Sequence, residues 1–90
     1  MTESEKAQQI VAALRAAEVS PPEAALQTLN GLMSLVRSPS VEQPLEVEEA
    51  RSAAFMSICE VGKALHRGQP TEALWPTALA ASERWLALAK

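Results

Sequence analysis

Hydrophobic residues recur every three or four positions along most of the chain, which is the spacing of one face of an α-helix. Four segments show this spacing, at residues 3–18, 21–37, 44–67 and 70–89. Their apolar stripes are, in turn, Ala7, Ile10, Leu14 and Ala17; Ala25, Leu26, Leu29, Leu32, Met33 and Val36; Val47, Ala50, Ala54, Ile58, Val61 and Leu65; and Leu74, Ala78, Ala81, Trp85 and Leu88. The pattern therefore predicts four amphipathic helices.

Three of these helices are preceded by the same short pattern, which is a polar residue, a proline, any residue and a glutamate. It occurs at residues 20–23, 43–46 and 69–72. Proline fits the first helical position, and a glutamate shortly after it suits the positive end of the helix dipole. The pattern predicts that the polar residue caps each helix. At the N-terminus, Thr2 and Glu5 have the spacing of a capping box.

The ends and interiors of the helices carry further signals. Gly68 follows the basic end of the third segment and can adopt the left-handed conformation that ends a helix. Asn30 and Gly31 lower the helix propensity of the second segment, so a kink or an early end is an alternative there. Pro76 would clash within a straight helix that began at residue 70. We expect either a kink at this proline or a main helix that begins at Pro76.

The connections between the segments indicate how the helices are arranged. The links near Ser20 and Gln69 are short, which favours antiparallel hairpins for segments one and two and for segments three and four. The link at residues 38–43 is longer and can cross between the hairpins. We therefore expect an all-α fold, a small four-helix bundle of two antiparallel hairpins, formed by residues 1–90 as a single domain.

The fourth segment is apolar over more than half of its circumference, so we expect it to be covered on more than one side. Trp75 and Trp85 are ten residues apart, which places them about 80° apart around a helix. One of them can fill the core while the other marks a surface for a partner; alternatively, both are packing residues. The candidate partner surface consists of Trp75, Leu79, Trp85 and Leu86.

Composition and charge exclude several classes of function. The chain has 90 residues and a net charge of −3, and 48% of its residues are hydrophobic. It contains no apolar run of the roughly 20 residues that span a bilayer, and its N-terminus lacks the order of a signal peptide. We therefore expect a cytoplasmic protein without a membrane partner. An acidic chain with scattered cations repels phosphate, so we do not expect a nucleic acid as its partner.

The residues that usually carry chemistry are scarce. The chain has one cysteine and one histidine, Cys59 and His66, which lie seven residues and about 10 Å apart along a helix. We interpret Cys59 as a small buried hydrophobic residue and the glutamates of residues 42–49 as partners of the helix dipole rather than metal ligands. The sequence thus predicts no catalytic residue, no cofactor and no metal site.

These observations favour a non-enzymatic module that binds another protein, a second copy of itself, or both. Adaptor, chaperone, immunity partner and regulatory subunit are the candidate roles. The alternative is a helical DNA-binding or transcription-regulating protein, with residues 21–37 as the recognition helix. That helix offers only Arg37 as a cation for contacting DNA, and it lies at the far end.

Overall fold

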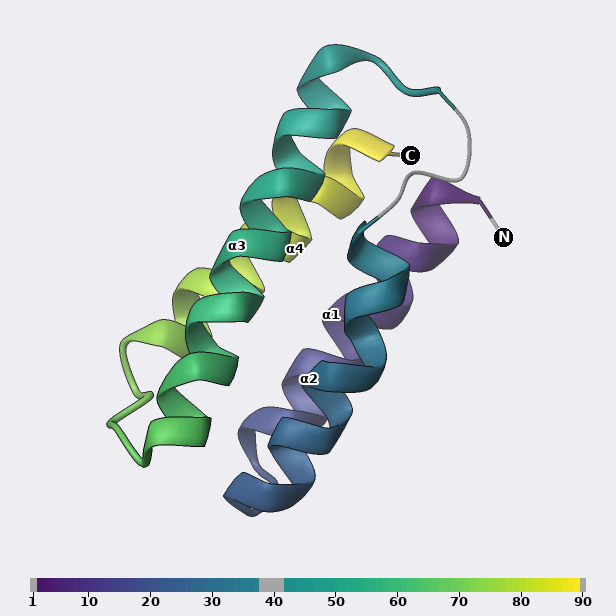
Figure 1. Cartoon of the computed structure of the whole chain (residues 1–90). Helices are drawn as coiled ribbons and strands as arrows, with labels where there is room; N and C mark the ends of the chain where they lie inside the picture. The colour runs from purple at the N-terminus through teal and green to yellow at the C-terminus, as the bar shows by residue number, and fades with distance from the viewer. Residues whose placement is uncertain (1, 38–41, 90) are drawn as a thin grey trace.

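Helices make up nearly all of the computed structural model, which describes residues 2–37 and 42–89. Within these ranges there are four helices and no strand: α1 (Glu3–Glu18), α2 (Pro22–Arg37), α3 (Leu45–Arg67) and α4 (Leu74–Ala89). Figure 1 shows them running alternately up and down the long axis of the molecule. The four predicted segments are confirmed as helices, with differences at their starts.

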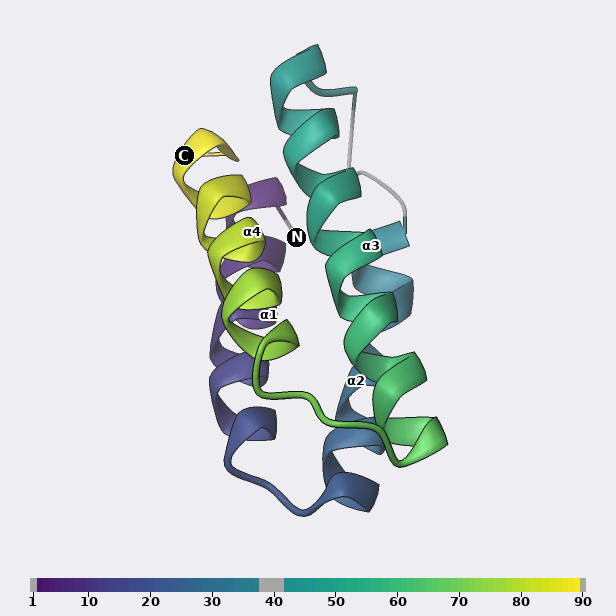
Figure 2. The ribbon, with the colours of Figure 1, turned by 90° about the vertical axis from the view of Figure 1, so that its left-hand side faces the viewer.

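Each helix packs against two neighbours. The contacting pairs are α1 with α2, α2 with α3, α3 with α4, and α4 with α1, whereas the backbones of the two diagonal pairs do not approach each other closely. Figure 2 shows α1 beside α4 and α2 beside α3. The molecule measures 37 × 21 × 17 Å along its principal axes. The fold is the expected four-helix bundle of two antiparallel hairpins. Residues 38–41 of the longer predicted link lie outside the described residues.

The predicted capping box at the start of α1 is confirmed. The Glu5 N–H donates a hydrogen bond to Thr2 Oγ1 at 3.1 Å, and the Thr2 N–H donates one to Glu5 Oε1 at 3.0 Å. These bonds satisfy backbone and side-chain groups that the first turn of a helix leaves unpaired.

The polar residues of the proline pattern are not caps, and this part of the prediction was wrong. Helix α2 begins at Pro22, and the Ser20 hydroxyl instead donates to the Ala16 carbonyl at 2.8 Å, in the last turn of α1. Helix α3 has Pro44 itself at its N-cap, with no side-chain hydrogen bond. A serine that can bond backward to the preceding helix satisfies a carbonyl there, and this competes with capping the next helix.

Helix α4 begins at Leu74, four residues later than the sequence predicted. The Thr71 carbonyl accepts hydrogen bonds from the N–H groups of Leu74 and Trp75, at 2.9 and 3.1 Å. Pro76 therefore lies in the first turn, where a missing N–H removes no intrahelical hydrogen bond. The helix begins two residues before Pro76, close to the second of the two alternatives.

The other two predictions about helix interruptions have opposite outcomes. Gly68 ends α3 with a φ of 68°, and its N–H bonds to carbonyls of the last turn, as predicted. Helix α2 continues through Asn30 and Gly31 to Arg37, so the early end considered there does not occur. Packing of the apolar stripe outweighs the low propensity of two residues.

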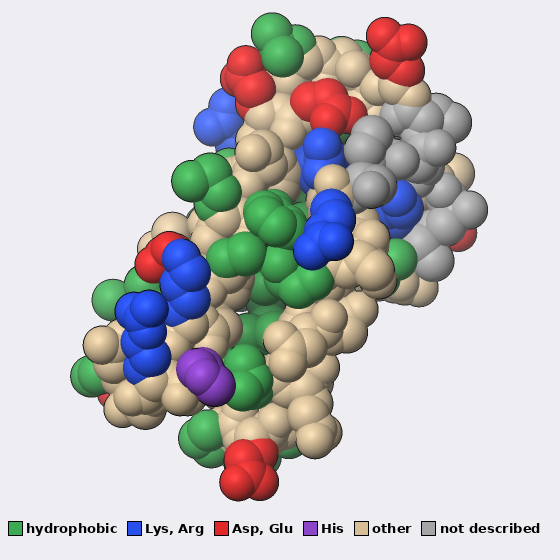
Figure 3. Space-filling view, in the orientation of Figure 1, with side chains coloured by type: hydrophobic (Ala, Val, Ile, Leu, Met, Phe, Trp, Pro, Cys, Tyr) green, Lys and Arg blue, Asp and Glu red, His purple; other side chains and the backbone are tan. Residues whose placement is uncertain are grey.

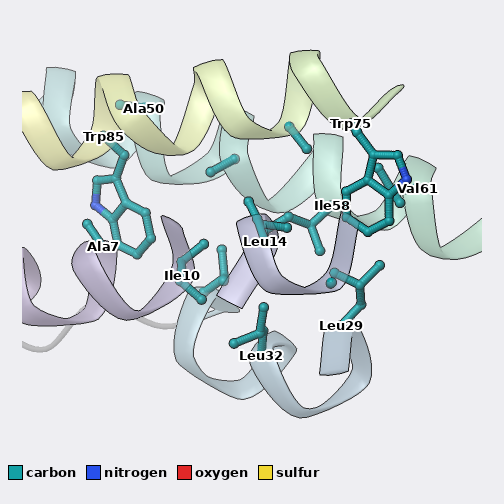
Figure 4. Close-up of a cluster of buried hydrophobic side chains, with 14 of the residues drawn as sticks. Ala7, Ile10, Leu14, Leu29, Leu32, Ala50, Ile58, Val61, Trp75 and Trp85 are labelled. Atoms are coloured by element: carbon teal, nitrogen blue, oxygen red, sulfur yellow. The ribbon is translucent and has the colours of Figure 1, made fainter. Parts of the chain in front are cut away.

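The core runs along the whole bundle between the four helices. Figure 4 shows Trp85 at one end of this core and Trp75 at the other, with Ile10, Leu14 and Ile58 between them. Trp85 has no exposed surface at all, and it is the largest of the fully buried side chains. The two indole rings therefore fill the ends of a core that is otherwise built from aliphatic side chains.

The glycines at 68 and 31 should respond oppositely to alanine. We expect Gly68→Ala to lower the free energy of unfolding by about 1 kcal/mol, because alanine is strained at this positive φ. Gly31→Ala should raise it by up to about 1 kcal/mol, because a Cβ there meets nothing within 4 Å and alanine is the better helix former. Urea unfolding of both variants measures this. Equal changes in the two variants would contradict it.

The capping box should make stability depend on pH. The pKa of Glu5 is lowered, first by the hydrogen bond from the Thr2 backbone and then by the Thr2 side chain. A lowered pKa stabilises the fold above the unfolded-state pKa, and this contribution is lost as the pH falls through the folded-state value. We expect Glu5→Gln to be less stable than the wild type at neutral pH, with the difference shrinking in acid. Unfolding curves across pH test this, and a constant difference would contradict it.

Candidate functional site

A groove lies between α2 and α3 on one long face of the bundle. It has a volume of about 360 Å³ and is lined by Leu26, Leu29, Asn30, Met33, Ile58, Cys59, Gly62, Lys63, His66 and Arg67. Figure 3 shows hydrophobic side chains gathered between the two helices, with Lys, Arg and the purple histidine on the α3 side. The floor is therefore apolar and one rim is basic.

Gly62 keeps this groove open. It lies in the interior of α3, where glycine costs about 1 kcal/mol relative to alanine. A Cβ added at this position would meet nothing within 4 Å, so packing inside the chain does not require a glycine. Its neighbours in the groove, Leu29 and Ile58, are core residues with 2% and 1% of their surface exposed. The accessible apolar surface of the groove therefore comes from the half-buried Leu26, Met33 and Cys59, and Gly62 places no side chain over it.

The basic rim comes from the last two turns of α3. Lys63, His66 and Arg67 are all exposed, and their charges also suit the C-terminal end of the helix dipole. Lys63 lies 3.5 Å from Glu60, but both side chains are about 60% exposed, and such pairs contribute little. The rim is therefore available to anionic groups, although the chain as a whole carries a net charge of −3.

The two tryptophans of the predicted partner surface are buried. Trp75 is 7% exposed and Trp85 is 0% exposed. Leu79 and Leu86 are half-buried and pack against the core. Of the two alternatives, the structure supports the one in which both indoles are packing residues. Both rings belong to a broad seam of residues at positions 75, 78, 82 and 85, because a helix between two neighbours buries an arc wider than 80°.

A buried polar cluster at the end of the bundle near the N-terminus was missed by the sequence analysis. Glu3 is only 4% exposed, and its Oε2 accepts a hydrogen bond from Trp85 Nε1 at 3.2 Å. Arg51 lies with its Nε 4.0 Å from the same oxygen. It also donates to the last two carbonyls of α2, at 2.7 and 2.9 Å, and to Glu48 Oε2 at 2.6 Å.

This cluster is structural, since its groups are directed at one another and join all four helices. Nothing in the sequence identified Glu3 or Arg51, because each interacts with residues far away along the chain. The groove was missed for a similar reason. Its one local signal is Gly62 inside a helix, followed by cations at positions 63, 66 and 67.

The groove offers little chemistry. Cys59 and His66 both line it, but they are separated by about 10 Å of helix, too far for the imidazole to take the thiol proton. Residues 2–37 and 42–89 hold no group of three or more His, Cys, Asp or Glu side chains that could bind a metal ion. What the groove can do is bury apolar side chains beside a basic rim.

Comparisons with protein-family models, with curated proteins and with solved structures give no match for this chain. No helix in the described ranges combines the length and the apolar character needed to cross a membrane.

Loss of the Glu3 carboxylate should destabilise the bundle. We expect Glu3→Ala to lower the free energy of unfolding by about 2–3 kcal/mol, because Trp85 Nε1 loses its acceptor and Arg51 loses a nearby anion. Glu3→Gln, which keeps an acceptor oxygen, should cost less. Chemical denaturation measures both.

The matched control is Glu83→Ala. Glu83 forms an ion pair with Arg15 at 3.0 Å, but the two side chains are 48% and 62% exposed, so its loss should cost less than about 1 kcal/mol. A loss from Glu83→Ala as large as that from Glu3→Ala would contradict the structural role of the buried cluster.

Proposed function

We propose that this chain is a non-enzymatic protein-interaction module, and that the groove between α2 and α3 binds a helical segment that carries apolar and acidic side chains. The observation that supports this most directly is the open groove at Gly62, with its apolar floor and basic rim. An amphipathic helix laid in a hydrophobic groove is a recurring mode of protein recognition.

Charge favours an acidic partner segment. Three exposed basic side chains on one rim attract carboxylates, and they disfavour a partner with a basic face. The apolar floor supplies affinity, because binding removes apolar surface from water. Together the two features select for a segment with both kinds of side chain.

A nucleic acid is the weaker candidate. The basic groups lie on α3 rather than on α2, which the sequence analysis considered as a recognition helix, and the chain contains 11 acidic residues against 8 Lys and Arg. Repulsion from the remaining surface opposes phosphate binding.

Site-specific photo-crosslinking in cells of the native host tests the proposal. A benzoyl-phenylalanine at position 30, on the rim of the groove, should give protein adducts, whereas the same group at the exposed Ala12 of α1 should not. Gly62→Leu fills the groove and should lower the adduct yield at least about tenfold, which corresponds to about 1.4 kcal/mol of binding.

The control variant is Gly62→Ala, which raises helix propensity but adds only one methyl group, and it should retain most of the adduct. Equal adducts from positions 30 and 12, or adducts unaffected by Gly62→Leu, would contradict the proposal. Adducts with DNA in place of protein would support the DNA-binding alternative.

A further inference from the structure

The outward face of α3 is not covered by α2 or α4. Glu49, Met56 and Lys63 lie on it at intervals of seven residues, which places them in one line along the helix. All three are exposed, and Met56 is 64% exposed, one of the few large hydrophobic side chains so open to solvent. This line therefore consists of an acid, an apolar residue and a base, in that order.

The order is symmetric about the middle of the helix. Helix α3 has 23 residues, and Met56 is its central one. Glu49 and Lys63 are each seven residues from Met56. A two-fold axis through Met56 would bring the positions in line with Met56 against their counterparts on a second, antiparallel α3. Glu49 would then face Lys63 at both ends of the contact.

We propose that the outward face of α3 packs antiparallel against α3 of a second copy of this chain, with Met56 at the two-fold axis. This contact goes beyond the proposed function, because it lies on the outward face of α3 and on its α4 side, away from the floor of the groove between α2 and α3. A parallel arrangement would instead place Glu49 against Glu49 and Lys63 against Lys63. Charge therefore selects the antiparallel pairing.

The shape of this face suits such a contact. A hollow of about 170 Å³ beside Met56, lined by Met56, Ser57, Glu60, Leu74 and Thr77, can receive the methionine of the second copy. Ala53 is small and exposed, which permits close approach of the two helices. Helix α3 is about 34 Å long, and the longest dimension of the molecule is 37 Å. The contact would extend along nearly the whole molecule.

Contacts within one chain do not satisfy these charges. Glu49 lines a hollow together with Arg84, yet it forms no ion pair within residues 2–37 and 42–89. Among the described residues, the one ion-pair partner of Lys63 is Glu60, at 3.5 Å, and both side chains are exposed. An acid and a base seven residues from the axis thus remain open to a partner.

Charge reversal tests the proposal by sedimentation of the purified full chain over a wide range of protein concentration. The wild type should dimerise, with an affinity that falls as salt is added. Glu49→Lys and Lys63→Glu should each raise the dimer dissociation constant at least about tenfold, because each sets like charges face to face at two symmetric places. The double variant Glu49→Lys/Lys63→Glu should recover most of the affinity.

Glu18→Lys is the matched control. It makes the same change in charge on α1, which is diagonal to α3, and it should leave the dimer unchanged. Circular dichroism of every variant checks that the helices are intact. A wild type that stays monomeric at all concentrations overturns the proposal. A double variant that dimerises no more tightly than the single variants overturns it as well.

Cysteine crosslinking gives a second, independent test. With Cys59→Ser as background, Met56→Cys should form a disulfide-linked dimer under mild oxidation, because facing residues at a two-fold axis come within the distance of about 7 Å that a disulfide requires. Ala87→Cys, at an exposed position of α4, should not. Equal dimer yields from both variants overturn the contact at Met56; the charge-reversal variants test its antiparallel direction.

The two proposals can fail separately. A monomeric protein whose position 30 crosslinks to a different protein overturns the second copy as partner and leaves the groove as a binding site. Both proposals are overturned if the dimer persists after charge reversal and position 30 gives no protein adduct.

Discussion

The hydrogen bond from Trp85 to Glu3 is the contact on which the rest of the structure depends most. It joins residues 82 positions apart and brings α4 back against the start of α1 inside the core. A buried carboxylate is destabilising unless its oxygens have partners, and Arg51 lies beside the same oxygen while it also binds α2 and Glu48. Because Trp85 Nε1 and the terminal nitrogens of Arg51 reach these partners only when all four helices are in place, the cluster sets the register of the bundle at this end.

Helix α3 connects this structural end with the candidate binding surface. Its first half supplies Arg51 to the cluster, and its second half supplies Gly62 and the basic rim of the groove. Acidic residues near its start and basic residues near its end suit its own dipole. The same separation of charge makes the outward face of the helix complementary to an antiparallel copy, so one charge pattern can stabilise both the helix and the proposed dimer.

Much of the fold could be predicted from local patterns, because helix periodicity and the capping box depend on residues close together in the sequence. The errors lie where a side chain or a carbonyl can hydrogen-bond to either of two neighbouring elements. Ser20 bonds to the preceding helix, and α4 begins at Leu74 because Thr71 provides the first carbonyl. Most of the candidate site could not be predicted from the sequence. Trp75 and Trp85 were placed on a possible surface, yet both are buried, since the angle between two side chains does not say how wide an arc the neighbouring helices cover.

The sequence by itself determined that the chain forms four amphipathic helices and that Gly68 ends the third, because spacing, backbone freedom and dipole effects act within a few residues. Only the tertiary structure decided which apolar residues are enclosed, that Glu3 and Arg51 meet, and that the groove opens beside Gly62. These features depend on which helices become neighbours and on the space left between them, and no local pattern along the chain carries that information.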